Sequence, residues 1–237
     1  MNDLWGSDIR QRINSAIRVL CPIIDERIKA RACAQWGEEE LRKELVACIL
    51  GSQVRHEMAV AAMRNLEFAG LLDDDWWATE SCEEFSSNVY AVLTGQWPDL
   101  PSRGRYRFSR ARADQLARAR DQLARLPLEA RLNSTQDTKQ LRHRLVADIP
   151  GIGPKQASMF LRNIGKSYDL AILDTHVLRF MNMQEAIPAT RVRIGTVAGY
   201  ERVEGAVVDY ADSLGYPAGY LDWAIWATMK AARELAL

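Results

Sequence analysis

Residues 149–154 read Ile-Pro-Gly-Ile-Gly-Pro and separate two stretches in which apolar residues recur at helical spacing. Two glycines two positions apart make a tight turn with little side-chain bulk, so a phosphate can approach the backbone N–H groups closely. The second stretch starts with a proline, which is favoured at the first helical position, and the positive end of its dipole faces the turn. The pattern predicts two helices within about 141–164, joined at this turn.

The helical spacing continues along the rest of the chain. A five-residue sequence repeated at 114–118 and 121–125 marks one amphipathic helix, and turn-forming residues gather at 95–101, 132–135, 165–168 and 215–219. Sustained alternation of apolar and polar residues, which would indicate strands, is missing. The sequence therefore predicts an all-α protein. Apolar residues on shared helix faces include Ile9, Ile13, Ile17, Leu20, Leu41, Leu45, Ile49, Met58, Ala62 and Leu66.

The composition is that of an ordinary globular protein, with 48% apolar and 26% charged residues among 237. This length supports one large domain or two small ones. No apolar run approaches the roughly 18 residues needed to cross a bilayer, and the first residues lack the apolar core of a signal peptide. We therefore expect a cytoplasmic protein that does not enter a membrane.

The cysteines, Cys21, Cys33, Cys48 and Cys82, are widely spaced and form no Cys-x-x-Cys pair. This spacing favours neither a zinc site nor a disulfide framework. We expect reduced thiols, no metal bound by side chains and no cofactor.

The charges balance over the whole chain, with 31 basic and 31 acidic residues, but they are unevenly distributed. Residues 103–144 contain twelve Lys or Arg against four Asp or Glu, which leaves nineteen against twenty-seven elsewhere. A basic segment that leads into the turn at 149–154 predicts a surface that follows a phosphate backbone. The alternative is an arginine-rich helix whose charges are simply solvated.

Lys155 follows the turn, and Asp174 comes nineteen residues later, just before Thr175 and His176. This order resembles the helix-hairpin-helix and Gly/Pro-Asp signature of the base-excision DNA glycosylase superfamily. Within the superfamily, Pro-Gly-x-Gly-x-Lys is similar to the hairpin of the 8-oxoguanine DNA glycosylase/AP lyases.

Two further stretches resemble the compact archaeal and bacterial group of these enzymes. One is the pair Arg107-Phe108 before a basic helix, and the other is Leu-Asp-x-x-Ile-Trp at residues 221–226. The likeness covers about 41–226, is strongest over 145–181 and is thin over the first forty residues.

The resemblance implies a two-lobed fold with a cleft between the lobes. A helical barrel over 38–165 would end in the helix-hairpin-helix at about 141–164. A second helical lobe, built from 1–37 and 166–237, would carry Asp174 and the base pocket. The endonuclease-three and adenine-glycosylase branches carry a C-terminal four-cysteine iron–sulfur cluster, which is not expected here because no cysteine follows Cys82.

The resemblance gives Lys155 the position of the nucleophile and Asp174 that of the catalytic aspartate. A neutral lysine amine can attack C1′ of a nucleotide, leave a Schiff base and permit β-elimination of the 3′ phosphate. In the first turn of a helix the dipole disfavours an ammonium, which favours this role. Asp is also a favoured N-cap, and a capping carboxylate stays ionised and can stabilise positive charge on the sugar. The alternatives are a surface lysine and a cap with no further role.

Further predictions concern contacts with DNA. Gly151 and Gly153 are expected to bind a phosphate. The resemblance implies that His176 lies near the phosphate of the flipped nucleotide. Arg107 is expected to contact the DNA backbone. Gln53 matches the position from which the superfamily fills the hole left by the extruded base. The alternatives are a structural turn, a helix-surface histidine and a polar helix-end residue.

The resemblance also suggests a structural monovalent cation on main-chain carbonyls of the hairpin. Trp226 and Trp223 are the predicted base pocket, because a flat ring can stack on a flipped purine; the alternative places both in the core. In the compact relatives the terminal lysine and its carboxylate lie near the damaged base. Here the chain continues past Lys230 to Leu237, a departure that bears on specificity for 8-oxoguanine.

Together these features predict a bifunctional DNA repair glycosylase/AP lyase that removes an oxidised purine, with 8-oxoguanine the first choice. The expected partner is double-stranded DNA containing that base, and we expect a monomer, associated with the nucleoid if the source is bacterial. Two alternatives stay open: the same lyase chemistry on another damaged base, and a non-catalytic helix-hairpin-helix module that binds DNA. The presence of both Lys155 and Asp174 argues against the second.

Overall fold

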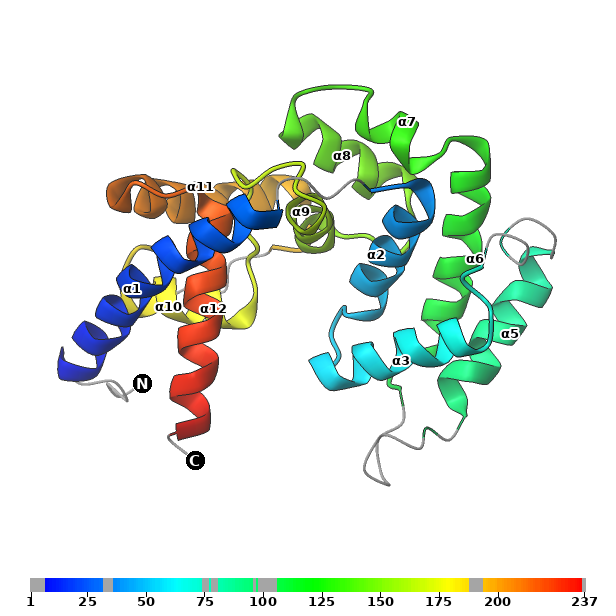
Figure 1. The fold of residues 1–237 in the computed structure, drawn as a ribbon, viewed down its shortest axis with the longest axis horizontal. Helices are drawn as coiled ribbons and strands as arrows, with labels where there is room; N and C mark the ends of the chain where they lie inside the picture. Colours follow the sequence, from blue (N-terminus) through cyan, green and yellow to red (C-terminus); the bar gives the residue numbers. More distant parts are fainter. Residues whose placement is uncertain are drawn as a thin grey trace. The chain divides into compact units, whose positions relative to one another are not determined.

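The computed structural model describes residues 7–31, 36–73, 77, 81–95, 97, 106–187 and 194–235. Within these ranges the secondary structure is helical and contains no strand, as Figure 1 shows. The predicted all-α class is confirmed. No helix in the described part of the chain is both long enough and apolar enough to cross a membrane.

The chain divides into two compact units. One is formed by a single stretch, Gln35–Ile164, and is called the continuous unit. The other combines Met1–Ala34 with Gly165–Leu237 and is called the discontinuous unit. The helix-hairpin-helix belongs to the first, and Asp174 belongs to the second.

The continuous unit is built around α2. This helix contacts α3, α6, α7 and α9, while α5 lies alongside α6 (Figure 1). Fully buried side chains fill the centre, and each contributes about 1.5–3 kcal/mol: Leu45, Ile49, Leu66, Phe85, Val89 and Leu116. The helices are α2 (Glu38–Leu50), α3 (His56–Phe68), α5 (Cys82–Thr94), α6 (Ser109–Arg125), α7 (Leu128–Leu132), α8 (Thr138–Asp148) and α9 (Pro154–Asn163).

The discontinuous unit is built around α12, which contacts α1, α10 and α11. It contains α1 (Ser7–Arg31), α10 (Thr175–Met183), α11 (Val197–Leu214) and α12 (Ala218–Leu235). One face of α1 is buried at helical spacing, through Ile13, Ile17, Cys21, Ile24 and Ile28. Ile9, which the spacing placed on that face, is 39% exposed. Helices from the two ends of the chain thus share one core.

Candidate active site

The turn at 149–153 joins α8 to α9 as predicted. Pro154 is the first helical residue of α9, and Gly153 is its N-cap. Gly151 has a φ of +89°, and a Cβ at this position would lie 3.1 Å from Cγ2 of Ile49. Both the left-handed backbone and the lack of space therefore require glycine at position 151.

Lys155 is the second residue of α9 and is half-buried. The interior face of the same helix is fully buried through Ala157, Phe160 and Leu161. The predicted position of Lys155 in the first helical turn is confirmed, and at that position the helix dipole disfavours a positive charge.

Cys48 on α2 is a second nucleophilic side chain in this part of the continuous unit. It is buried, and its Sγ donates to Oε1 of Glu44 at 3.5 Å. Burial raises the pKa of the Cys48 thiol well above its usual value; Glu44 adds to the rise, while Arg162 and Lys155 oppose it. A thiol kept protonated is a poor nucleophile, which leaves the lysine as the better candidate.

A buried arginine connects the two helices of the hairpin. Arg142 on α8 is fully buried, and its Nη1 donates to Oγ of Ser158 on α9 at 3.1 Å. Ser158 lies one helical turn after Lys155. The bond therefore fixes α9 against α8 close to the candidate nucleophile.

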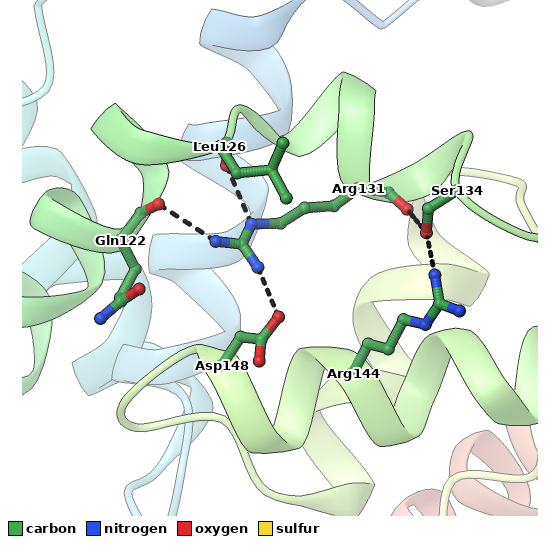
Figure 2. A network of polar contacts seen from close by, with 6 residues as sticks. All are labelled: Gln122, Leu126, Arg131, Ser134, Arg144 and Asp148. Carbon is green, nitrogen blue, oxygen red and sulfur yellow. Dashed lines mark hydrogen bonds and ion pairs between the residues drawn. The ribbon is translucent and has the colours of Figure 1, made fainter.

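Arg131 holds the end of α8, as Figure 2 shows. Its Nε donates to the carbonyl of Leu126 at 2.9 Å, and its Nη2 donates to the carbonyl of Gln122 at 3.1 Å. Its Nη1 bonds to Oδ2 of Asp148 at 2.7 Å. The guanidinium thus satisfies carbonyls at the end of α6 and fixes the last residue of α8 before the turn.

The arginines of the basic segment at 103–144 are of two kinds, buried and exposed. Its buried arginines are Arg112, Arg120, Arg131 and Arg142. Arg112 donates to the carbonyl of Ser52 at 3.0 Å, and the guanidinium of Arg120 lies 4.7 Å from the ring centre of Phe85. For these four arginines, both predictions are wrong, because a buried guanidinium neither follows a phosphate backbone nor is solvated. The exposed cations, among the described residues, are Arg107, Arg110, Arg118, Arg125, Lys139 and Arg144.

Asp174 is the N-cap of α10, as predicted. Its Oδ1 accepts hydrogen bonds from the backbone N–H groups of His176 and Val177, both at 2.8 Å. The residue is half-buried. Because both bonds end on Oδ1, the cap leaves Oδ2 for another role.

The residues just before Asp174, at 170–173, are buried but not helical. Three consecutive backbone N–H groups in this segment donate to side chains of α11 and α12. The bonds run from Ala171 to Oε1 of Glu204 at 3.0 Å, from Ile172 to Oδ2 of Asp222 at 2.6 Å, and from Leu173 to the hydroxyl of Tyr200 at 2.9 Å.

Sequence reasoning gave no role to Glu204 or Asp222, which are both only 2% exposed. A signal was available for Asp222, because it interrupts an apolar stretch of α12. An acid at a core position is rare unless it has partners, so it predicts a nearby donor. What the sequence lacks is the identity of that donor, fifty residues away.

His176 lies in the first turn of α10 and is half-buried. Its Nδ1 is buried and makes no hydrogen bond within the described part of the chain. A buried polar atom without a partner costs about 1–3 kcal/mol. The unpaired Nδ1 of His176 therefore lowers the stability of the fold.

The sequence predicted Gln53 at the end of a helix. In the structure it lies in the turn after α2, whose C-cap is Gly51. It is exposed and has a φ of +62°. A side chain in this left-handed region costs roughly 1–2 kcal/mol. Arg107 is also exposed, with its guanidinium 5.1 Å from the ring centre of Phe108.

The two predicted pocket tryptophans lie on α12. Trp223 is half-buried and packs against the core of the discontinuous unit. Trp226 is half-buried as well, and Nζ of Lys230 lies 5.1 Å from its ring centre. The ammonium covers part of one face of the indole and is held there by cation–π attraction.

No group of three or more His, Cys, Asp or Glu side chains that could hold a metal ion occurs among the described residues. Cys21, Cys48 and Cys82 are free thiols, and Cys33 lies outside the described residues.

The predicted site residues are divided between the units. The continuous unit contributes Lys155, Gly151, Gly153, Gln53 and Arg107. The discontinuous unit contributes Asp174, His176, Trp223 and Trp226. Within each unit, residues close in sequence share one turn: the glycines with the lysine, and the aspartate with the histidine.

Residues 24–216 match the family model described as 8-oxoguanine DNA glycosylase. The chain belongs to this family. The matched range includes the hairpin, Lys155 and Asp174, and ends before Trp223.

Several archaeal relatives named 8-oxoguanine DNA glycosylase/AP lyase are similar over most of their length. The protein of Metallosphaera sedula is 29% identical over 214 residues, 85% of this chain and 92% of its own. That of Sulfurisphaera tokodaii is 32% identical over 180 residues, 76% of this chain and 77% of its own. The match with the Saccharolobus solfataricus protein is 37% identical over 123 residues, 52% of this chain, and spans only 58% of that relative.

Solved structures of 8-oxoguanine DNA glycosylases are similar to the whole fold. The enzyme of Thermotoga maritima is 26% identical with a TM-score of 0.66, over 92% of this chain and 94% of that one. The Methanocaldococcus jannaschii 8-oxoguanine glycosylase/lyase in complex with 15mer DNA containing 8-oxoguanine is 27% identical with a TM-score of 0.60, over 94% and 92%.

Proposed function

We propose that this protein is a DNA glycosylase and AP lyase that removes 8-oxoguanine from double-stranded DNA. The observation that carries the proposal is Lys155, half-buried in the first turn of α9 directly behind the glycine turn, in a member of the 8-oxoguanine DNA glycosylase family. The names of the relatives in Metallosphaera and Sulfurisphaera support both activities.

In the proposed reaction the neutral amine of Lys155 attacks C1′ of the damaged nucleotide. The C1′–N9 bond breaks, and the base leaves with the bonding electrons and takes up a proton. The nitrogen then loses a proton and forms the imine with C1′ as the C1′–O4′ bond breaks and O4′ takes up a proton, which opens the sugar ring. The imine acidifies the C2′ proton, whose loss expels the 3′ phosphate and cleaves the strand. Asp174 stabilises the positive charge that develops on the sugar and helps to activate the lysine.

The phosphate contacts that we propose are provided by both units. The N–H groups of the turn around Gly151 and Gly153 bind one phosphate, supported by the dipole of α9. Arg107 is exposed and adds a charge on the same unit. His176, half-buried in the first turn of α10, binds the phosphate of the flipped nucleotide.

Gln53 is the residue that we propose fills the space left by the flipped base. Its left-handed backbone supports this role, because strained residues in exposed turns persist where function requires them. The side chain is exposed and sits on a turn between two helices, so it can enter a duplex without moving the core.

For the base pocket, we propose that Trp226 stacks on the purine and that Trp223 supports it from the core side. Lys230 lies over the Trp226 ring, so the base would use the rest of the indole surface. The oxidised base differs from guanine by an N7–H donor and an O8 acceptor, which polar neighbours must read.

We propose no cofactor, except a monovalent cation on main-chain carbonyls of the hairpin. The turn at 149–153 contains no carboxylate, and Asp148 beside it is bonded to Arg131. A divalent ion would therefore lack charged ligands there, while carbonyl oxygens alone suit a monovalent one. We also propose that the protein acts as a monomer in the cytoplasm, in contact with the nucleoid if its source is bacterial.

The direct test is borohydride trapping on a duplex with one 8-oxoguanine. An imine reduced in place gives a covalent protein–DNA adduct, which peptide mapping should assign to Lys155. Matched duplexes with undamaged guanine, another oxidised base or an abasic site separate lyase chemistry from base choice. Adducts on the abasic duplex alone would refute 8-oxoguanine as the substrate, and no adduct on any duplex would refute the lyase.

The stacking role has its own comparison. Trp226→Ala should slow base excision far more than cleavage at a ready-made abasic site, where no base must be stacked. Equal losses on the two substrates would assign Trp226 to the core.

A further inference from the structure

We propose that Asp222 and Tyr200 are positioning residues that fix where Asp174 stands; the proposal rests on the proposed function of Asp174. Neither side chain needs to touch DNA for this role. They act on the backbone of the three residues that precede the aspartate.

The buried segment at 170–173 creates the need for such partners. It is neither helix nor sheet, and its residues are at most 6% exposed, so its backbone cannot bond to water. A buried N–H group without a partner is strongly unfavourable. Side chains must therefore provide the acceptors that regular secondary structure would otherwise provide.

The acceptors alternate between two helices. The N–H groups of Ala171 and Leu173 bond to side chains of α11, whereas that of Ile172 bonds to Asp222 of α12. Three consecutive N–H groups are thus bound by side chains of two different helices, and α11 and α12 together fix the segment.

Tyr200 makes two hydrogen bonds to the segment, because its hydroxyl both accepts and donates. It accepts from the N–H of Leu173 at 2.9 Å and donates to the carbonyl of Ala171 at 2.8 Å. Tyr200 is 1% exposed, so its ring cannot turn away without opening the core. One hydroxyl therefore sets the spacing of two residues on the same side of the segment.

The restraint passes directly to Asp174. Its backbone N–H donates to the carbonyl of Ile172 at 2.9 Å, and its Oδ1 is fixed by two N–H groups of α10. The backbone is thus set by α11 and α12, and the side chain by α10. Because a displacement of about 1 Å in a catalytic group can cost about a hundredfold in rate, this over-determination matters to the reaction.

Asp222 also explains the Leu-Asp-x-x-Ile-Trp segment at 221–226. Leu221, Ala224 and Ile225 are fully buried core residues, and Asp222 beside them is 2% exposed. The acid is there for the 2.6 Å bond to the N–H of Ile172. The segment therefore connects the candidate pocket helix to Ile172, whose carbonyl in turn accepts from the N–H of the candidate catalytic aspartate.

The test compares Tyr200→Phe and Asp222→Ala with two matched variants. Asp222→Asn keeps an acceptor for Ile172, and Ser213→Ala removes a side-chain bond to the carbonyl of Tyr210 elsewhere on α11. Single-turnover excision of 8-oxoguanine, duplex affinity and urea unfolding are measured on each. Amide hydrogen exchange is followed at His176 and Val177, which report whether Asp174 still caps α10.

Tyr200→Phe and Asp222→Ala should slow excision about 10- to 100-fold, with duplex affinity changed less than about twofold and faster exchange at both amides. Asp222→Asn should recover most of the rate, and Ser213→Ala should equal the wild type. Excision within twofold of wild type in both disruptive variants overturns the proposal. A loss fully accounted for by the unfolded fraction, or unrescued by Asp222→Asn, overturns it too.

The design separates this proposal from the proposed function. A wild type without excision activity refutes the function, and hydrogen exchange then decides the positioning. Faster exchange at His176 and Val177 in Tyr200→Phe, with unchanged exchange in α5 and α6, supports it. Unchanged exchange at the two amides overturns it.

Discussion

The two units hold their candidate catalytic residues with buried charges of opposite sign. In the continuous unit, Lys155 lies in the first turn of α9, and Arg142 of α8 is bonded to Ser158 of the same helix. Arg131 fixes the end of α8. In the discontinuous unit, Asp174 follows a segment braced by Glu204 and Asp222. Each unit thus carries buried side chains whose charge has the same sign as that of its candidate catalytic residue.

The backbone explains the difference. Helix ends leave carbonyl groups without partners, and Arg131 donates to two of them at the end of α6. A buried segment outside helices and sheets leaves N–H groups without backbone partners, and here two carboxylates accept from them. A buried charge near a candidate site should therefore first be explained by the backbone group that it satisfies, and only then by the chemistry.

The sharpest way to break the comparison is to remove the candidate nucleophile. Lys155→Gln should abolish both the borohydride adduct and strand cleavage, because a carboxamide cannot form an imine. Duplex affinity and urea unfolding should stay close to wild type, since the side chain is half-buried at a helix start. Lys43→Gln, at a lysine of α2 bonded to Glu39, is the control. An adduct that persists in Lys155→Gln would move the nucleophile elsewhere.

The second prediction uses the N-cap aspartates of both units. Asp174→Asn keeps the cap but removes the charge, so excision should fall at least about a hundredfold, with stability changed by about 1 kcal/mol or less. Asp137 caps α8 with the same geometry, accepting at 2.9 and 3.0 Å. Asp137→Asn should leave the rate unchanged. Equal rates in the two variants would make Asp174 a cap alone.

The third prediction sharpens the role of burial, using one buried and one exposed arginine that Figure 2 shows. Arg131→Met removes bonds to two carbonyls and a carboxylate and should cost about 3 kcal/mol in unfolding free energy. Arg144→Met removes bonds of an exposed guanidinium to Ser134 and Gln140 and should cost about 0.5 kcal/mol or less. Urea unfolding measures both. Similar losses of unfolding free energy in the two variants would mean that burial does not strengthen the hydrogen bonds of Arg131.

A fourth comparison sets one left-handed glycine of each unit against the other. Gly215 has a φ of +75° with open space around it, so Gly215→Ala should cost about 1 kcal/mol for the backbone alone. Gly151→Ala adds contacts of 3.1 Å with Gln115 and Ile49 and should cost about 2 kcal/mol. Only the second should weaken duplex binding. Thermal unfolding and duplex titration decide between these outcomes.

The smallest effect is expected at the non-glycine residues with positive φ. Gln53, with φ +62°, lies in the continuous unit, and Glu185, with φ +57°, lies in the discontinuous unit. Replacing either by glycine relieves strain and should stabilise the protein by up to about 1 kcal/mol. Only Gln53→Gly should slow excision. A loss of stability in both would show that the backbone is not strained.

The all-α class is predicted correctly because it depends on short-range rules, and the family because the hairpin, Lys155 and Asp174 resemble its signature. Pro154 at the helix start and Asp174 as a cap follow from residue preferences within one turn. The functional prediction agrees with the names of the relatives. The domain bounds and the roles of the site residues stay predictions.

What the sequence could not predict depends on distant partners. Within α6, Arg118 is exposed, whereas Arg120 is buried with its guanidinium 4.7 Å from the ring centre of Phe85 on α5. Tyr200 likewise finds its partners at Ala171 and Leu173, almost thirty residues earlier. Composition counts every arginine as a possible phosphate ligand, whereas packing has already used some of them.

The chain order has a consequence for biosynthesis. The continuous unit is complete once Ile164 has left the ribosome, and a contiguous unit can fold while the rest is still being made. The apolar face of α1, which includes Ile13 and Ile17, packs with residues of α12 and has no such partner yet. Until α12 has been made, the nascent protein therefore lacks the helix with which α1 makes most of its contacts, and part of the apolar face of α1 is open to chaperones and proteases.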